Sequence, residues 1–165
     1  MSSKNTPANK VMQSRYLEWK LGVAQGYDWL DIINFILIFS AEITDYELAD
    51  SELEKIKELN KELFVEWSGN KDFEPNEPGK KLKIAFNWYN GLIKDLPEEE
   101  WDQKRTDVCL NSAKWLMNQE WFDKDFAKRL IKYVCEVAEA DGQVIENEKG
   151  NTNAMAQIFG VAQPY

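Results

Sequence analysis

The stretch from Trp29 to Ala41, WLDIINFILIFSA, constrains the fold more than any other part of this sequence. Its apolar residues cover most of the circumference of a helix predicted over about residues 28–43, so no face of that helix suits water. Such a helix is stable only when other elements pack around it, and we expect it at the centre of the fold. Asp31 and Asn34 interrupt the run, which is too short to span a bilayer. We therefore expect no membrane insertion.

Helical periodicity continues along the rest of the chain, and no segment shows the period-two alternation of a strand. Residues 1–8 are predicted to be a disordered leader, and the Gly- and Pro-containing stretch 68–79 a long loop. The expected fold class is all-α, a single-domain bundle of about seven helices over residues 9–165. The predicted helices cover about 9–26, 28–43, 51–66, 80–96, a segment beginning at Pro97, 123–140 and 147–159.

The same periodicity predicts which side chains are buried. Cys109 and Cys135 lie in apolar helical patterns and form no C-x-x-C pair, so we interpret them as core thiols. Trp67 and Trp121 stand near the ends of elements and are expected to be partly exposed. The residues expected at the bundle centre are Leu30, Ile33, Ile38, Phe39, Leu130, Ile131 and Val134.

The chain contains no histidine. This excludes Ser-His-Asp and Cys-His nucleophiles, an imidazole general base, and zinc, iron or haem held by histidine. A hydrolase using two carboxylates is still conceivable, but it needs a pocket and one acid with a raised pKa, which solvent-facing loop acids rarely provide. We expect a protein that is not an enzyme and has no organic cofactor.

A formal net charge of −9 argues against nucleic acid as a partner, because a binder must bring cations to the phosphates. It also disfavours an anionic membrane surface. Cations and proteins with basic surfaces are the expected partners. The polar N-terminus has no apolar run of signal-peptide type, so a cytoplasmic location is expected.

Two acidic segments match each other at a constant offset of 96 residues. They are residues 45–52, DYELADSE, and residues 141–148, DGQVIENE. In both segments the first residue is Asp, the fourth is aliphatic, the sixth is acidic, the seventh is a residue type favoured at N-caps, and the eighth is Glu. The flanking apolar positions also correspond. The predicted repeated unit is a buried helix, a short acidic loop and a second amphipathic helix, over about 28–66 and again over about 123–160.

Two interpretations of these loops stay open. Helix capping accounts for part of the acidity, since Ser51 and Asn147 are good N-caps and acids are favoured at helix starts. It does not account for Asp45 and Asp141, which are predicted at the C-terminal ends of the preceding helices, where acids oppose the dipole. A bound cation would relieve that repulsion. The oxygen-only ligand set suits calcium or magnesium, with candidate ligands Asp45, Asp50, Glu52, Asp141, Glu146 and Glu148.

The sequence resembles the tellurite-resistance TerB-like family of small all-helical cytoplasmic proteins. The resemblance is carried by AEADGQV over residues 138–144 with Glu148 after it, and by AQIFGV over residues 156–161. It implies a helical bundle whose two acidic loops lie near one another and bind metal ions. It also implies a role in stress or toxic-oxyanion response within a larger protein assembly, without catalytic activity. Tyr46 stands where the second loop has Gly142, so the second loop is the stronger candidate site.

Two functions from different classes are therefore expected. One is a cation-binding helical module in a stress-response assembly, and the other is a metal-free acidic scaffold that docks a protein partner. Calcium should raise the melting temperature under the first hypothesis and leave it unchanged under the second.

Overall fold

Six α-helices and one short 3-10 helix make up the described part of the chain, and no strand is present there. The computed structural model describes residues 27–42, 48–69, 72–142 and 144–165. The predicted leader 1–8 and the predicted helix 9–26 lie outside these residues. The all-α fold class is confirmed for the described residues. The elements are α2 (Trp29–Glu42), α3 (Asp50–Ser68), α4 (Glu77–Gly91), η3 (Glu98–Glu100), α5 (Trp101–Met117), α6 (Lys124–Glu139) and α7 (Glu146–Phe159).

Local chemistry explains several helix boundaries. The Asp28 carboxylate caps α2 by accepting the N–H groups of Leu30 and Asp31 at 3.0 and 3.1 Å. As predicted, Gly160 ends α7, and its φ of +69° is a left-handed conformation that glycine adopts without a Cβ penalty. The predicted start of α4 is wrong by one turn. Proline is tolerated in a first helical turn, so α4 already includes Pro78 and the preceding loop is shorter than predicted.

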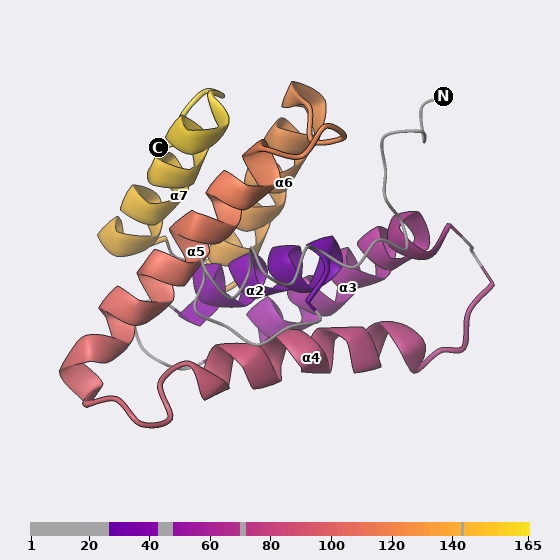
Figure 1. Cartoon of the computed structure of the whole chain (residues 1–165), viewed down its shortest axis with the longest axis horizontal. Coiled ribbons are helices and arrows are strands. Elements are labelled where there is room, and N and C mark those ends of the chain that lie inside the picture. The colour runs from indigo at the N-terminus through magenta and orange to yellow at the C-terminus, as the bar shows by residue number, and fades with distance from the viewer. Residues whose placement is uncertain (1–26, 43–47, 70–71, 143) are drawn as a thin grey trace.

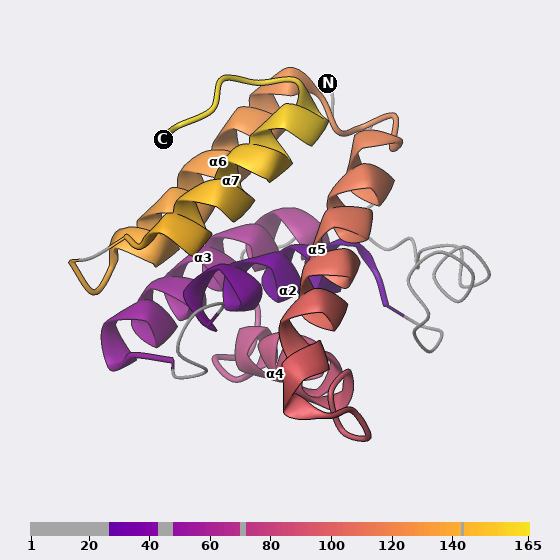
Figure 2. The same cartoon turned by 90° about the vertical axis from the view of Figure 1, so that its left-hand side faces the viewer.

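Helix α2 lies at the centre of the described structure, as its sequence predicts. It contacts α3, α4, α5, α6 and α7. In both Figure 1 and Figure 2, α2 lies between α4 on one side and the adjacent pair α6 and α7 on the other. Every residue of α2 from Trp29 to Ala41 is buried, as expected of a helix that is apolar around most of its circumference.

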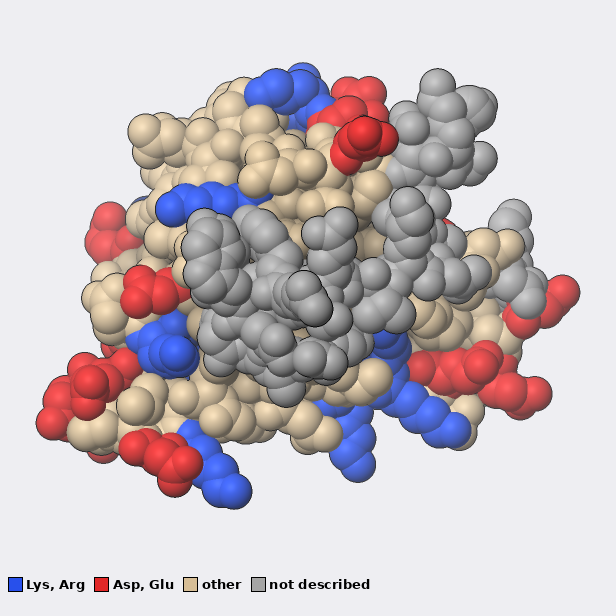
Figure 3. Space-filling model, viewed as in Figure 1, with Lys and Arg blue, Asp and Glu red and all other residues tan. Residues whose placement is uncertain are grey.

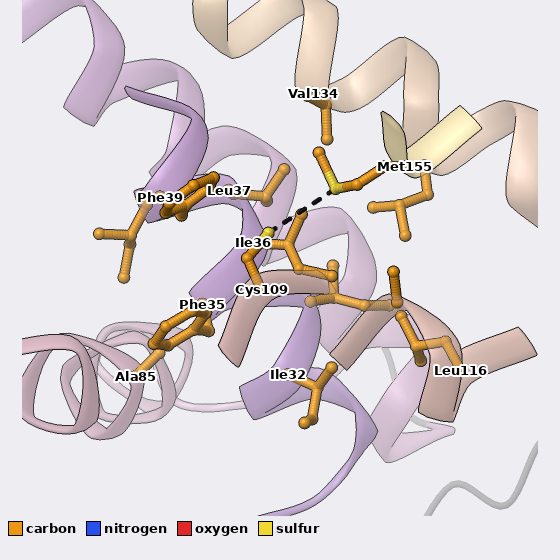
Figure 4. Close-up of a cluster of buried hydrophobic side chains, with 14 of the residues drawn as sticks. Ile32, Phe35, Ile36, Leu37, Phe39, Ala85, Cys109, Leu116, Val134 and Met155 are labelled. Atoms are coloured by element: carbon orange, nitrogen blue, oxygen red, sulfur yellow. Dashed lines mark hydrogen bonds between the residues drawn. The ribbon is translucent and has the colours of Figure 1, made fainter. Parts of the chain in front are cut away.

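The core forms where α2 meets its neighbours (Figure 4). All seven residues predicted at the bundle centre are buried, none more than 6% exposed. Cys109 is also buried, and its Sγ lies 3.8 Å from Met155 Sδ, whereas Cys135 is only half-buried. The prediction for Trp121 is wrong, because its ring packs 5.3 Å from that of Trp29 and is 8% exposed.

The polar residues inside α2 each have a partner in the described structure. Ser40 Oγ donates to the Ile36 carbonyl at 2.7 Å, which satisfies the hydroxyl within the helix. Asn34 Nδ2 donates to Asn60 Oδ1 at 2.8 Å and so ties α2 to α3. Asp31 pairs with Lys81 of α4. No helix among the described residues is long and apolar enough to cross a membrane.

Candidate functional site

The first acidic loop is described only from Leu48 onward, so the candidate ligand Asp45 lies outside the described residues. Asp50 is the exposed first residue of α3. Glu52 is only 3% exposed, and its Oε1 accepts the backbone N–H of Ala49 at 3.0 Å. This carboxylate therefore satisfies a helix-terminal N–H group that would otherwise have no intrahelical partner.

The second acidic loop has the same arrangement, offset by 96 residues. Glu148 is 6% exposed, and its Oε1 accepts the backbone N–H of Ile145 at 3.0 Å. Glu146 is exposed, and one of its carboxylate oxygens lies 3.6 Å from Lys149 Nζ. Asp141 is exposed just beyond the end of α6, and Gly142 after it has a φ of +86°, as the predicted turn requires.

The predicted N-caps are displaced by two residues in both loops. The N-cap positions are Ala49 and Ile145 rather than Ser51 and Asn147. Alanine and isoleucine side chains have no acceptor, so only half of a capping box forms at each helix, from the glutamate three residues later. Glu52 and Glu148 are therefore parts of helix starts.

The remaining acids do not come together into a cation site within the described structure. Both the start of α3 and the loop between α6 and α7 lie toward the same side of the molecule, at the left in Figure 2. No group of three or more acidic or cysteine side chains among the described residues is placed to hold a metal ion.

A buried charge cluster joins the start of α2 to α3 and α4, and the sequence did not reveal it. Lys81 Nζ lies 2.6 Å from Asp28 Oδ2 and 2.9 Å from Asp31 Oδ1. Trp67 Nε1 donates to Asp28 Oδ2 at 3.0 Å, and the Lys81 ammonium lies 4.6 Å from the centroid of the Trp67 ring. Two carboxylates thus share one ammonium group.

One acid of this cluster, Asp31, has a markedly raised pKa. Burial, and then the Asp28 charge, raise the pKa of Asp31 from 3.8 to about 6, although Lys81 opposes both effects. A raised pKa is what a catalytic acid needs, but Asp31 is 1% exposed and lines neither of the hollows described below. The geometry is that of a structural tie between helices.

An apolar hollow of about 630 Å³ lies between α3 and α4. Buried Leu82 and half-buried Leu53 and Phe86 line it, together with Pro75 and Pro78. Phe73, in the loop between the two helices, forms another wall, and its ring centroid lies 5.0 Å from that of Phe64.

Asn60 is the polar residue buried in this hollow. Its Oδ1 accepts from Asn34, and its Nδ2 donates to the Pro78 carbonyl at 2.7 Å. These two bonds hold α3 against α2 and against the first turn of α4. The hollow is therefore a preformed feature whose shape depends on a buried amide network.

Three exposed lysines, Lys57, Lys61 and Lys83, also line the hollow. A second hollow of about 460 Å³ adjoins it, sharing Lys61 and Phe73 and adding Glu58, Glu62 and Val65. We call the two together the α3–α4 groove. In Figure 3, basic side chains project from the lower edge of the molecule, where α4 runs in Figure 1, with acidic side chains beside them.

The sequence did not reveal this groove, because residues 68–79 were predicted only as a long loop and the packing of Phe73 against Phe64 was not foreseen. The available signal was Phe73, a large apolar residue in an otherwise polar segment. Comparison with protein-family models, with curated proteins and with solved structures finds no match for this chain.

Proposed function

We propose that this chain is a non-enzymatic helical module that binds a partner protein, and that the α3–α4 groove is its binding surface. The observation that carries the proposal is a preformed apolar hollow of about 630 Å³, within the range of about 300–1,000 Å³ typical of ligand sites. Its walls are two helices, and apolar grooves between helices commonly receive an apolar helix face of a partner.

The scaffold hypothesis from the sequence placed the partner on the acidic loops. We instead place the partner in the α3–α4 groove, because the groove is concave and apolar. Asp50, Asp141 and Glu146 are exposed acids at helix ends. A convergent apolar surface supplies more binding free energy than isolated exposed charges, whose pairs contribute about 0–1 kcal/mol.

Cation binding stays a proposal, with the second loop as its main site. Glu148 accepts the backbone N–H of Ile145 and Glu146 lies 3.6 Å from Lys149 Nζ, so a cation at this loop would have to replace these contacts. A role in tellurite-type stress resistance is likewise a proposal, and it rests on the TerB-like resemblance.

Site-specific photocrosslinking in the host cell tests the binding function. A photoreactive residue at Lys83 in the groove is compared with the same residue at Lys114, an exposed position on α5 that does not line the groove. We expect a discrete adduct of higher mass from position 83 and none from position 114. Equal labelling at both positions, or none at position 83, would argue against the groove as a binding surface.

A further inference from the structure

The α3–α4 groove has the length of a helix rather than of a compact ligand. The residues of α3 that line it run from Leu53 to Val65. At 1.5 Å per residue this is about 18 Å, or a little over three helical turns. An amphipathic helix that presents apolar side chains at i, i+3, i+4 and i+7 spans such a length.

The charge of the groove differs from that of the whole chain. Although the protein has a net charge of −9, the deeper hollow is lined by three lysines and no acid. Lys57 lies 3.5 Å from Glu54, whereas Lys61 and Lys83 form no ion pair with any residue in the described ranges. Lysine stems cover apolar surface while their ammonium groups stay at the rim, where they can meet carboxylates.

The charges also differ around α3. Lys57 and Glu58 are consecutive residues, so they project about 100° apart around the helix axis rather than from its two ends. Lys57 and Lys83 belong to the deeper hollow, and Glu58 and Glu62 line the adjoining one. An occupant whose acids lie on the side of the deeper hollow therefore meets the lysines and keeps those acids away from Glu58 and Glu62. Such complementarity sets orientation and association rate more than affinity.

The chain's own N-terminal segment has the wrong charge for this groove. Residues 1–26 contain four basic residues, Lys4, Lys10, Arg15 and Lys20, and one acid, Glu18. A segment of net charge +3 is repelled by a lysine rim, so a partner with acids is the better match.

We propose that the groove binds an amphipathic helix of a partner protein in which acidic residues flank one side of the apolar face. This inference rests on the proposed binding function of the groove. The lysines attract the acidic flank, the apolar floor contacts the apolar face, and Glu58 and Glu62 disfavour acids on the opposite side of the bound helix.

Three synthetic 16-residue peptides test the inference by fluorescence anisotropy with the full chain. They share a Leu/Phe face with helical spacing and differ in flanks of Glu, Gln or Lys. We expect the Glu-flanked peptide to bind roughly 5-fold or more tightly than the Gln-flanked one, and the Lys-flanked peptide to bind most weakly. The differences should shrink between 50 mM and 500 mM NaCl, because salt screens exposed charges.

A charge-reversed double variant, K61E with K83E, should invert the preference among the peptides. The matched control is K94E with K114E, which changes the net charge equally at exposed positions outside the groove and should leave the order unchanged. Phe86→Gln should weaken all three peptides, whereas Ile84→Gln, at a 40% exposed position of α4 that does not line the groove, should not.

The outcomes separate this inference from the proposed function. Equal binding of the Glu and Gln peptides, with both lost in Phe86→Gln, would overturn the acidic partner but leave a binding groove. Crosslinking at Lys83 without binding of any peptide would overturn the amphipathic helix. Binding of palmitate without any peptide would assign the groove to a small amphiphile. Absence of both crosslinking and peptide binding would overturn both proposals.

Discussion

Replacing Asp31 with asparagine is expected to change how the stability of this protein depends on pH. Burial and the nearby Asp28 charge raise the pKa of Asp31 to about 6 in the folded protein, although Lys81 opposes them. In the unfolded chain an aspartate titrates near about 3.9. The folded state therefore binds this proton more tightly. Protonation of Asp31 therefore stabilises the folded state. This stabilisation is fully present below about pH 3.9 and is lost as the pH rises through about 6.

The magnitude follows from the shift. A change from 3.8 to about 6 corresponds to about 3 kcal/mol over the whole titration. About 2 kcal/mol of this falls between pH 4.5 and 7.5. Asparagine has a similar shape and no charge to titrate, so the variant should not lose this part of the stability. Relative to the parent protein, Asp31→Asn should therefore gain about 2 kcal/mol between pH 4.5 and 7.5.

Urea unfolding followed by far-UV circular dichroism at four pH values measures this difference directly. Asp95→Asn, which removes a carboxylate from an exposed position between α4 and α5, is the matched control for the loss of one charge. The comparison uses only how the free-energy gap between variant and parent changes with pH. A pH-independent loss of stability from an altered contact with Lys81 therefore cancels. If the free-energy gap between Asp31→Asn and the parent protein is the same at pH 4.5 and 7.5, the assigned effect of burial on Asp31 is wrong.

Leu130 is 1% exposed, so Leu130→Ala should lower the free energy of unfolding by about 2–5 kcal/mol in urea, and a loss under about 1 kcal/mol would place α6 at the periphery. Glu148→Ala removes the side-chain acceptor at the start of α7 and should cost about 1 kcal/mol, whereas Glu146→Ala, at an exposed position, should cost less than about 0.5 kcal/mol. If the second acidic loop binds calcium, calorimetry on chelator-stripped protein should give a heat that Asp141→Asn abolishes and Asp45→Asn weakens less. No heat and no thermal shift at millimolar calcium would leave the loops as helix caps.

Local sequence was sufficient to predict the described helices and most of the core, although α4 spans Glu77–Gly91 rather than the predicted 80–96. The circumference of α2 is apolar at nearly every position, so its burial required no knowledge of its neighbours. Gly142 and Gly160 occupy left-handed conformations that favour glycine, which is why their turns could be located from sequence. The N-cap of α3 could not be located from sequence. Glu52 lies three residues after Ala49 and Glu54 lies three residues after Ser51, so either glutamate could accept the N–H group of an N-cap residue. Packing of Leu48 against the core accompanies the use of Glu52.

The candidate site depended on contacts that helical periodicity does not contain. Asp28 and Lys81 are 53 residues apart in sequence, and Trp121 meets Trp29 across the core. Periodicity shows which face of a helix is apolar, but not which other helix lies against it or how far each helix is rotated about its axis. Those two quantities come from the packing of all the helices together. They place Lys81 against two buried aspartates and leave Lys61 and Lys83 exposed at the rim of an apolar groove.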